Sequence, residues 1–168
     1  MRVRLVVLSV LLVAASALAV AALGQQAKAK ACSSGSTART ASYQLALKLG
    51  PRQEMYMPSE VQARKIKSGQ VMLGGSMEMA DAAPGSKVFD LAVYVCTKSG
   101  AIVTQLKPTI EVRAMGAKPH KMEVAMMAAV GKGLSDYHYG NDVALEPGAK
   151  VTVIVTVKGQ RAVLQQCR

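Results

Sequence analysis

Val151-Thr152-Val153-Ile154-Val155-Thr156-Val157 is the stretch that decides the fold of this sequence. Every residue in it is β-branched, and such side chains crowd the turns of a helix but pack well on the pleated surface of a strand. Turn-forming residues enclose it, with Pro147-Gly148 before it and Lys158-Gly159 after it. The sequence therefore predicts a strand at residues 151–157, followed by a final strand at 161–166.

Upstream of this stretch, short runs of alternating apolar and polar residues recur between glycine and proline turns. We predict strands at residues 41–49, 71–79, 88–96, 101–104, 109–113 and 121–127. The run at 121–127 also fits a short helix that continues to residue 130, but the turn residues around it favour a strand. Seven or eight strands spaced by about ten residues predict an all-β fold, an immunoglobulin-like antiparallel β-sandwich, over residues 41–168.

The N-terminus carries the pattern of a secretory signal peptide. Arg2 and Arg4 precede an almost wholly apolar run at residues 5–23, and Ala22-Leu23-Gly24 supplies a small-residue cleavage site. We therefore expect residues 1–24 to be removed and the mature protein to be secreted to an extracytoplasmic location, the periplasm or cell envelope. The alternative is an uncleaved membrane anchor, because roughly 20 apolar residues can span a bilayer.

Export makes a disulfide the default state for two of the three cysteines, Cys32, Cys96 and Cys167. Cys96 and Cys167 each end a predicted strand, whereas Cys32 lies within residues 25–40, whose small polar side chains predict a flexible linker. We therefore favour a Cys96–Cys167 disulfide, with Cys32–Cys167 as the alternative. Lipidation of Cys32 is disfavoured by the lysines that precede it.

The composition also bears on partners and on chemistry. The net charge is +11, and about +9 remains after loss of the signal peptide. The lysines are scattered, and there is no tryptophan and only one phenylalanine to stack bases, so we expect a solvated basic surface and no nucleic-acid partner. No serine–histidine–acid pattern, glycine-rich phosphate loop or metalloprotease histidine pair is visible. We therefore expect no enzymatic activity and no small-molecule substrate; a homodimer is left open.

Methionine is the anomaly of the composition, with ten methionines against one phenylalanine. Thioethers bind soft metal ions, above all Cu(I) and often beside histidine, although methionine also fills cores that are poor in aromatic residues. Met126 and Met127 precede a polar and aromatic stretch, residues 134–142, that contains His138. We predict that this stretch is a loop between two strands. His120 lies on the other side of the methionines, so the two histidines converge if the chain reverses between them.

The segment that contains Met126-Met127, the run His138-Tyr139-Gly140-Asn141-Asp142-Val143-Ala144-Leu145, Pro147-Gly148 and the strand at 151–157 resembles the C-terminal part of the periplasmic high-affinity ferrous-iron transport family. Glu54-Met55-Tyr56-Met57-Pro58 is similar to an early methionine-and-tyrosine stretch of that family. The resemblance covers about a third of the mature chain. It implies an immunoglobulin-like sandwich that binds copper or iron and acts beside a membrane metal permease.

The resemblance also implies a set of metal ligands, because the metal sites of that family use histidine, methionine and carboxylate side chains. The corresponding residues are His138, Met126, Met127, His120 and Glu54. The family carries histidine on a central strand, whereas residues 87–96 of this chain contain no histidine and Asp90 is their only acid. The expected function is copper or iron binding in support of metal uptake, and the alternative is a metal-free protein-interaction domain of the envelope.

Overall fold

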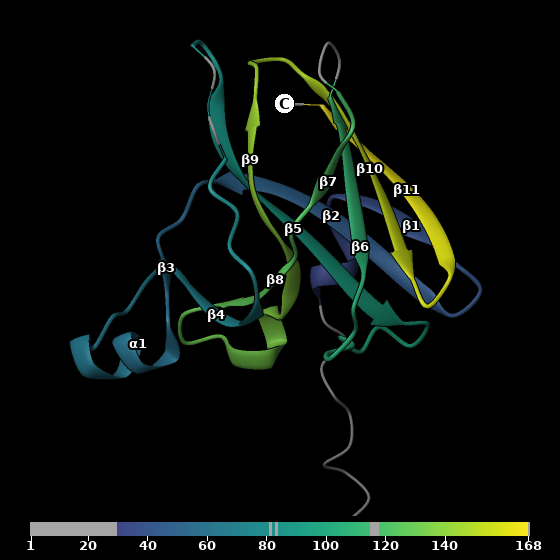
Figure 1. Ribbon diagram of the computed structural model, residues 1–168. Helices are drawn as coiled ribbons and strands as arrows, with labels where there is room; N and C mark the ends of the chain where they lie inside the picture. Colours follow the sequence, from purple (N-terminus) through teal and green to yellow (C-terminus); the bar gives the residue numbers. More distant parts are fainter. Residues whose placement is uncertain (1–29, 81, 83, 115–117, 168) are drawn as a thin grey trace, which may run out of the picture.

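The strands of the protein form two sheets that pack face to face (Figure 1). The computed structural model describes residues 30–167 except 81, 83 and 115–117. Within these residues the larger sheet has seven strands in the order β1-β2-β5-β9-β8-β4-β3, and the smaller has four in the order β11-β10-β6-β7. Neighbouring strands run antiparallel except β3 and β4, which are parallel. The predicted all-β sandwich is confirmed, with more strands than the seven or eight expected.

The elements are short and follow one another closely along the chain. The large sheet contains β1 (Ser36–Arg39), β2 (Tyr43–Pro51), β3 (Met55–Tyr56), β4 (Gln70–Gly75), β5 (Lys87–Thr97), β8 (Ala125–Ala129) and β9 (His138–Leu145). The small sheet contains β6 (Thr109–Ala114), β7 (His120–Met122), β10 (Lys150–Val157) and β11 (Gln160–Cys167). In the described part of the chain the helical segments are α1 (Pro58–Arg64) and two 3₁₀ helices, η1 (Lys30–Ser33) and η2 (Gly133–Asp136). Among the described residues, no helix combines the length and the apolar character needed to cross a bilayer.

The core lies between the two sheets and is built from alternate residues of the long strands. Leu91, Val93 and Val95 of β5 point inward, as the period of two in the sequence predicts, and Val153 and Val155 of β10 meet them from the small sheet. These side chains are fully buried. The β-branched stretch at 151–157 is therefore the central strand β10, paired with β11 on one side and β6 on the other.

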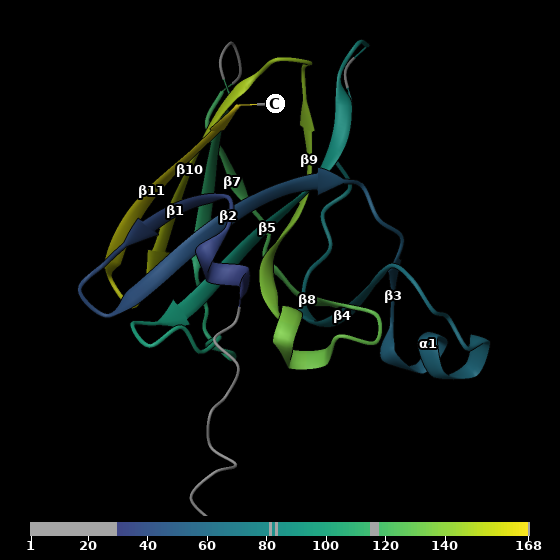
Figure 2. The same ribbon diagram turned by 180° about the vertical axis from the view of Figure 1, so that it is seen from behind.

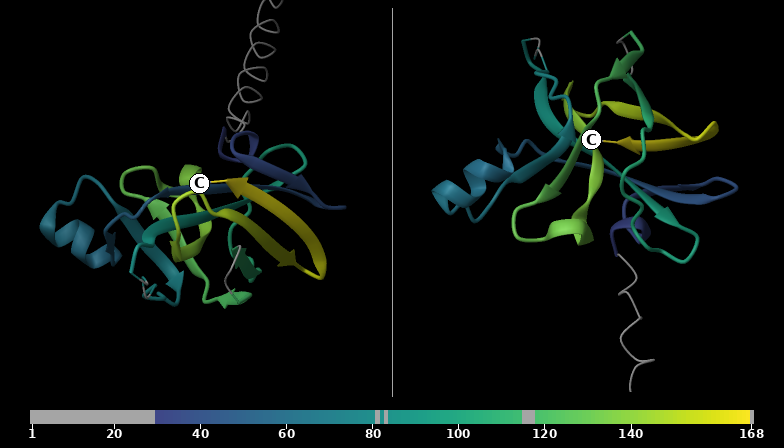
Figure 3. Two further views of the ribbon diagram at one scale, coloured as in Figure 1. Left: turned by 90° about the horizontal axis from the view of Figure 1, so that it is seen from above. Right: turned by 60° about the horizontal axis from the view of Figure 1, so that its bottom comes forward.

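The sandwich is closed along one side and open along the other. On the closed side β1 lies beside β11, where the backbone N–H of Gln165 donates to Ser36 Oγ at 3.1 Å (Figure 2). The turn before β2 is held to the start of β11, because the N–H of Ser42 donates to Gln160 Oε1 at 2.9 Å. On the open side β3, β4 and α1 extend past the small sheet (Figure 3). Among the described residues, the strands of both sheets lie within residues 36–167.

The structure corrects two predictions about connecting segments. The described part of the predicted linker, residues 30–40, is not a flexible tether, because it forms η1 and then β1, which pairs with β2. The predicted loop at 134–142 is instead η2 followed by the first half of β9. Its polar side chains are tolerated in a strand because they are hydrogen-bonded there. The predicted signal peptide at 1–24 lies outside the described residues.

Two predicted strands also differ from the observed ones. The run at 121–127 is divided between β7 in the small sheet and β8 in the large sheet, so the chain changes sheets at residues 123–124. The segment at 101–104 makes a single bridge, Ile102 to Cys96, rather than a strand. The strand predicted at 71–79 ends at Gly75 and contains a bulge between Met72 and Gly74, where its glycines indicated an irregularity.

The disulfide joins Cys32 to Cys96, so the predicted Cys96–Cys167 pair is wrong, and so is its Cys32–Cys167 alternative. Val95 points into the core, and its neighbour Cys96 therefore faces outward from the large sheet, where η1 brings Cys32 against it. Cys167 ends β11 in the other sheet, opposite Lys150, and is an exposed free thiol. A disulfide is typical of an oxidising environment outside the cytosol.

Candidate functional site

His138 lies on the outer face of the large sheet, in the first position of β9. Its neighbour Tyr139 points into the core, where the hydroxyl accepts a hydrogen bond from the N–H of Leu106 and donates one to the carbonyl of Val103. Because successive side chains of a strand point to opposite faces, His138 points away from the core. Its exposed fraction is nevertheless only 1%. A polar cluster rather than apolar packing therefore surrounds the ring.

The imidazole of His138 is held at both nitrogens. Nδ1 lies 2.7 Å from the carbonyl oxygen of Asp136, and Nε2 lies 3.2 Å from Gln70 Oε1. Gln70 reaches over from β4 and uses its amide nitrogen to donate to Asp90 Oδ2 on β5, at 2.6 Å. One buried glutamine thus links a base on β9 with an acid on β5.

These contacts fix the two ends of the Gln70 amide. Its Nε2 donates to Asp90 Oδ2, so its Oε1 faces His138 Nε2 and can accept a hydrogen bond from that nitrogen. The two side chains that Gln70 connects are therefore joined through an amide and do not touch each other's charge directly.

The environment of Asp90 favours the protonated form of its carboxyl. Burial raises the pKa of the Asp90 carboxyl above its ordinary value of 3.8, and the charge of His138 and the hydrogen bond from Gln70 oppose this effect. Asp142, the cross-strand partner of Asp90, raises the pKa of Asp90 further. Asp142 itself pairs with Arg52 at 2.8 Å. Burial raises the pKa of the Asp142 carboxyl above its ordinary value, and the Arg52 guanidinium opposes part of this effect.

Tyr94 covers the other side of the His138 ring, with their centroids 5.2 Å apart. Its hydroxyl donates to Asp136 Oδ1 at 2.9 Å, and the other oxygen of Asp136 accepts the N–H of Ala129 at 3.0 Å. Burial first, and then the charge of Asp136, raise the pKa of Tyr94 well above its ordinary value of 10.0, so the hydroxyl remains a donor. The ammonium of Lys48 lies 4.6 Å from the centre of the Tyr94 ring and places a positive charge at the rim.

A cavity of about 680 Å³ opens at this cluster on the outer face of the large sheet, and we call it the histidine pocket. Its floor carries His138, Gln70 and Asp90. On this face of β9, the residue between His138 and Asp142 is Gly140, and its cross-strand partner on β5 is Ala92. The sheet is hollow here because both residues are small. A Cβ at Gly140 would lie 1.7 Å from the carbonyl oxygen of Leu91, so this position excludes every side chain.

Two methionines form a row with His138 across three neighbouring strands of the large sheet. Met127 of β8 is the cross-strand partner of His138, and Met72 of β4 is the partner of Met127. Directly opposed residues share a face, with Cβ atoms about 4.5–5.5 Å apart. Met127 is fully buried, but it does not belong to the core between the sheets. One imidazole and two thioethers therefore occupy adjacent positions on one face.

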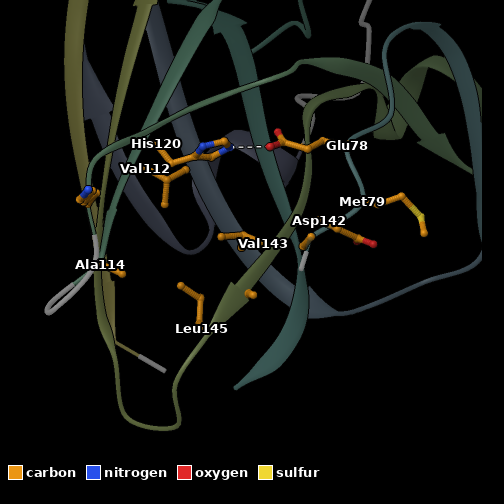
Figure 4. A pocket seen from close by; sticks show the side chains of 11 residues that line it. Glu78, Met79, Val112, Ala114, His120, Asp142, Val143 and Leu145 are labelled. Carbon is orange, nitrogen blue, oxygen red and sulfur yellow. Dashed lines mark ion pairs between the residues drawn. The ribbon is translucent and has the colours of Figure 1, made fainter. Parts of the chain in front are cut away.

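The remaining predicted ligands lie elsewhere. Met126 faces the opposite side of the sheet and packs against the core. Glu54 accepts a hydrogen bond from the hydroxyl of Tyr56 beside β3. His120 pairs with Glu78 at 2.7 Å across a separate cavity of about 290 Å³ at the open edge between the sheets, in which Val143 and Leu145 also point inward (Figure 4). Of the predicted metal ligands, the structure brings only His138 and Met127 together.

Sequence reasoning missed several residues of the histidine pocket and of the methionine row beside it. Asp90 had a visible signal, since it is the one acid within the most apolar strand, and Met72 belonged to the methionine excess. Gln70 had none, because its role depends on the lateral order of β4, β8, β9 and β5. In the described part of the chain, no three histidine, cysteine, aspartate or glutamate side chains converge as a metal-binding group.

Comparison of this chain with protein-family models, with curated proteins and with solved structures found no match.

Proposed function

We propose that this protein is an exported binding protein of the cell envelope that holds a copper ion, as Cu(I), at His138 and supports metal uptake. The observation that carries the proposal is the cross-strand row Met72–Met127–His138. It places two soft thioether donors in register with an imidazole that lines the histidine pocket. Thioether and imidazole together are a donor set that suits Cu(I).

The hydrogen bonds of His138 fit the role of a ligand. Metal-binding histidines usually donate the N–H of one nitrogen to a carbonyl or carboxylate, which fixes the tautomer and leaves the other nitrogen for the metal. The carbonyl of Asp136 is such a partner for Nδ1. Nε2 would then take the metal in place of its contact with Gln70 Oε1, while the amide nitrogen of Gln70 keeps its hydrogen bond to Asp90. Tyr94 and Asp136 keep the ring in place.

The donor set also bears on which metal is bound. Fe(II) sites are typically built from histidines and carboxylates, and they need several such side chains around one point. The described residues contain no cluster of three such side chains. The neighbours of His138 are thioethers, which favours copper over iron. We further propose that the partner is a membrane metal permease, an expectation that comes from the family resemblance alone.

A Cu(I) titration under anaerobic conditions, in competition with a chromogenic chelator, tests this function. The chain from Gln25, which contains all the described elements, is compared with its Met127→Leu and Met72→Leu variants. Leucine preserves the volume of methionine and removes only the sulfur. We expect each variant to bind Cu(I) at least tenfold more weakly than the unmodified chain.

Matched controls come from the residues that the structure places elsewhere. Met126→Leu is one residue away on the opposite face, and His120→Ala removes the histidine of the other cavity. Neither should change the affinity. Equal losses from Met126→Leu and Met127→Leu would overturn the site. If the unmodified chain takes up no Cu(I), the metal function fails and a metal-free interaction domain becomes the better reading.

A further inference from the structure

One end of the sandwich gathers basic side chains from connections that are far apart in the sequence. It contains the turn between β1 and β2, the β5–β6 connection, the β8–β9 connection and the turn between β10 and β11, and we call it the basic end (Figure 1, below). The strand register aligns these segments, because Tyr43 pairs with Thr97 and Thr156 pairs with Thr109. The Cys96–Ile102 bridge holds the β5–β6 connection against β5, and the Ser42–Gln160 hydrogen bond connects the two sheets there.

The charge of this end is almost entirely positive. Its exposed basic residues are Arg39, Lys98, Lys107, Lys132, Lys158 and Arg161. Asp136 is the only acid in residues 40–42, 98–108, 130–137 and 158–159, and both of its carboxylate oxygens already accept hydrogen bonds. At the opposite end acids and bases are mixed, with Glu78 and Glu146 near Lys118 and Lys150. The predominance of positive charge is therefore a property of the basic end.

Apolar side chains protrude beside these charges. Leu134, on η2, is 64% exposed, and Leu73, the extra residue of the β4 bulge, is 44% exposed. Both line one cavity of about 470 Å³ together with Lys107 of the β5–β6 connection. Exposed leucines ringed by lysines combine the two features by which proteins bind the interface of an anionic membrane.

We propose that the basic end docks on the surface of an anionic phospholipid bilayer, with Leu134 and Leu73 entering the headgroup layer. The cations sit on four separate connections rather than around one point, which suits an extended charged plane better than a single ligand. Aliphatic side chains rather than exposed aromatic ones accompany the cations, which disfavours stacking on nucleic acid. This inference does not depend on metal binding.

The basic end lies beside the histidine pocket. Lys132 and Asp136, both in the β8–β9 connection, also line the histidine pocket. A docked molecule would thus hold the mouth of that pocket close to the membrane.

Co-sedimentation with vesicles tests the proposal, using the chain from Gln25 so that the apolar run at 5–23 cannot itself bind lipid. The vesicles contain either phosphatidylcholine alone or phosphatidylcholine with about a third phosphatidylglycerol. We expect binding to the anionic vesicles only, and weaker binding as the salt concentration rises, because salt screens exposed charges. Lys107→Glu with Lys132→Glu should weaken it at least tenfold, and Leu134→Ser with Leu73→Ser should weaken it several-fold.

The controls change the same properties at other places. Lys118→Glu with Lys150→Glu reverses two charges at the opposite end, and Val163→Ser removes an apolar side chain that is 45% exposed on β11. Both should bind as the unmodified chain does, and thermal unfolding would establish that every variant is folded. Equal loss of binding in the controls, equal binding to both vesicle types, or tighter binding to single-stranded nucleic acid than to anionic vesicles would overturn the proposal.

Discussion

At the scale of single residues, Gln70 joins the acid and the base of the histidine pocket. Its amide spans from Asp90 to His138 through hydrogen bonds of 2.6 Å and 3.2 Å. Both side chains that it connects are buried, so neither can replace this partner with bulk water. An amide is well suited to the position, because its two ends have opposite hydrogen-bonding character.

The raised pKa of Asp90 gives a testable pH dependence. The folded protein binds the Asp90 proton more tightly than the unfolded chain does, so the stability that this proton contributes is complete below pH 3.8 and is lost as the pH rises through the folded pKa. As the pH rises from 3.8 through the folded pKa, we expect the unfolding free energy of the unmodified chain to fall relative to that of Asp90→Asn. Denaturant unfolding at successive pH values measures it.

The exposed carboxyl of Glu146 supplies the control for the Asp90 series. Glu146→Gln removes one negative charge at the surface, and the unfolding free energies of this variant and the unmodified chain should run parallel in the same pH range. A constant difference between the unmodified chain and Asp90→Asn at all pH values would contradict a buried, proton-holding Asp90.

At the scale of elements, the close approach of β9 to β5 shapes the histidine pocket. Gly140 lies directly opposite Ala92, and the backbone of β5 occupies the space that a side chain at residue 140 would need. The missing side chain at Gly140 and the small one at Ala92 leave the hollow between His138 and Asp142. Because β5 and β9 are the middle strands of the large sheet, a change in their spacing would also displace core residues such as Val93 and Tyr139.

Gly140→Ala should therefore destabilise the protein by about 1–3 kcal/mol, the usual cost of adding a methyl group where packing is already tight. Denaturant unfolding would show a lower midpoint with an unchanged slope. Gly50→Ala on β2 is the matched control, because a Cβ there meets no atom within 4 Å. Equal midpoints for the two variants would mean that β5 and β9 can separate without penalty.

At the scale of the whole molecule, the N-terminal part of the described chain helps to close the sandwich. β1 completes the large sheet at the side where β11 ends the small one, and the disulfide fixes η1 on the outer face at Cys96. Ala31 and Cys32 pack with Ala46, Ala92 and Tyr94 in a second, smaller apolar cluster on that face. This cluster supports Tyr94, which in turn holds the ring of His138.

Loss of the disulfide should be costly, because it joins residues 64 positions apart and so restricts the unfolded chain strongly. We expect Cys32→Ala with Cys96→Ala to lower the unfolding free energy by about 4 kcal/mol, within the 2–5 kcal/mol typical of native disulfides. Equilibrium denaturation measures this loss. Cys167→Ala is the control and should be neutral, since that thiol is free and exposed. A destabilising Cys167→Ala would contradict the assigned pairing.

The sequence by itself determined the class of fold and the faces of its main strands. The β-branched run at 151–157 indicates a strand. The alternation around Val93 predicts which side chains point inward, because the pleat of a strand repeats every two residues. The polar residues at 134–142 led to the wrong prediction of a loop. The local pattern does not reveal that a buried strand can satisfy its polar groups through partners on other strands.

Only the tertiary structure decided which residues meet. Gln70 and His138 are 68 residues apart, and Cys32 and Cys96 are 64 apart, and neither distance carries a signal in the sequence. Their contacts follow from the lateral order of the strands and from the register of each pair. These are set by the packing of the whole sandwich, because a strand's pattern specifies its buried face but not its neighbour.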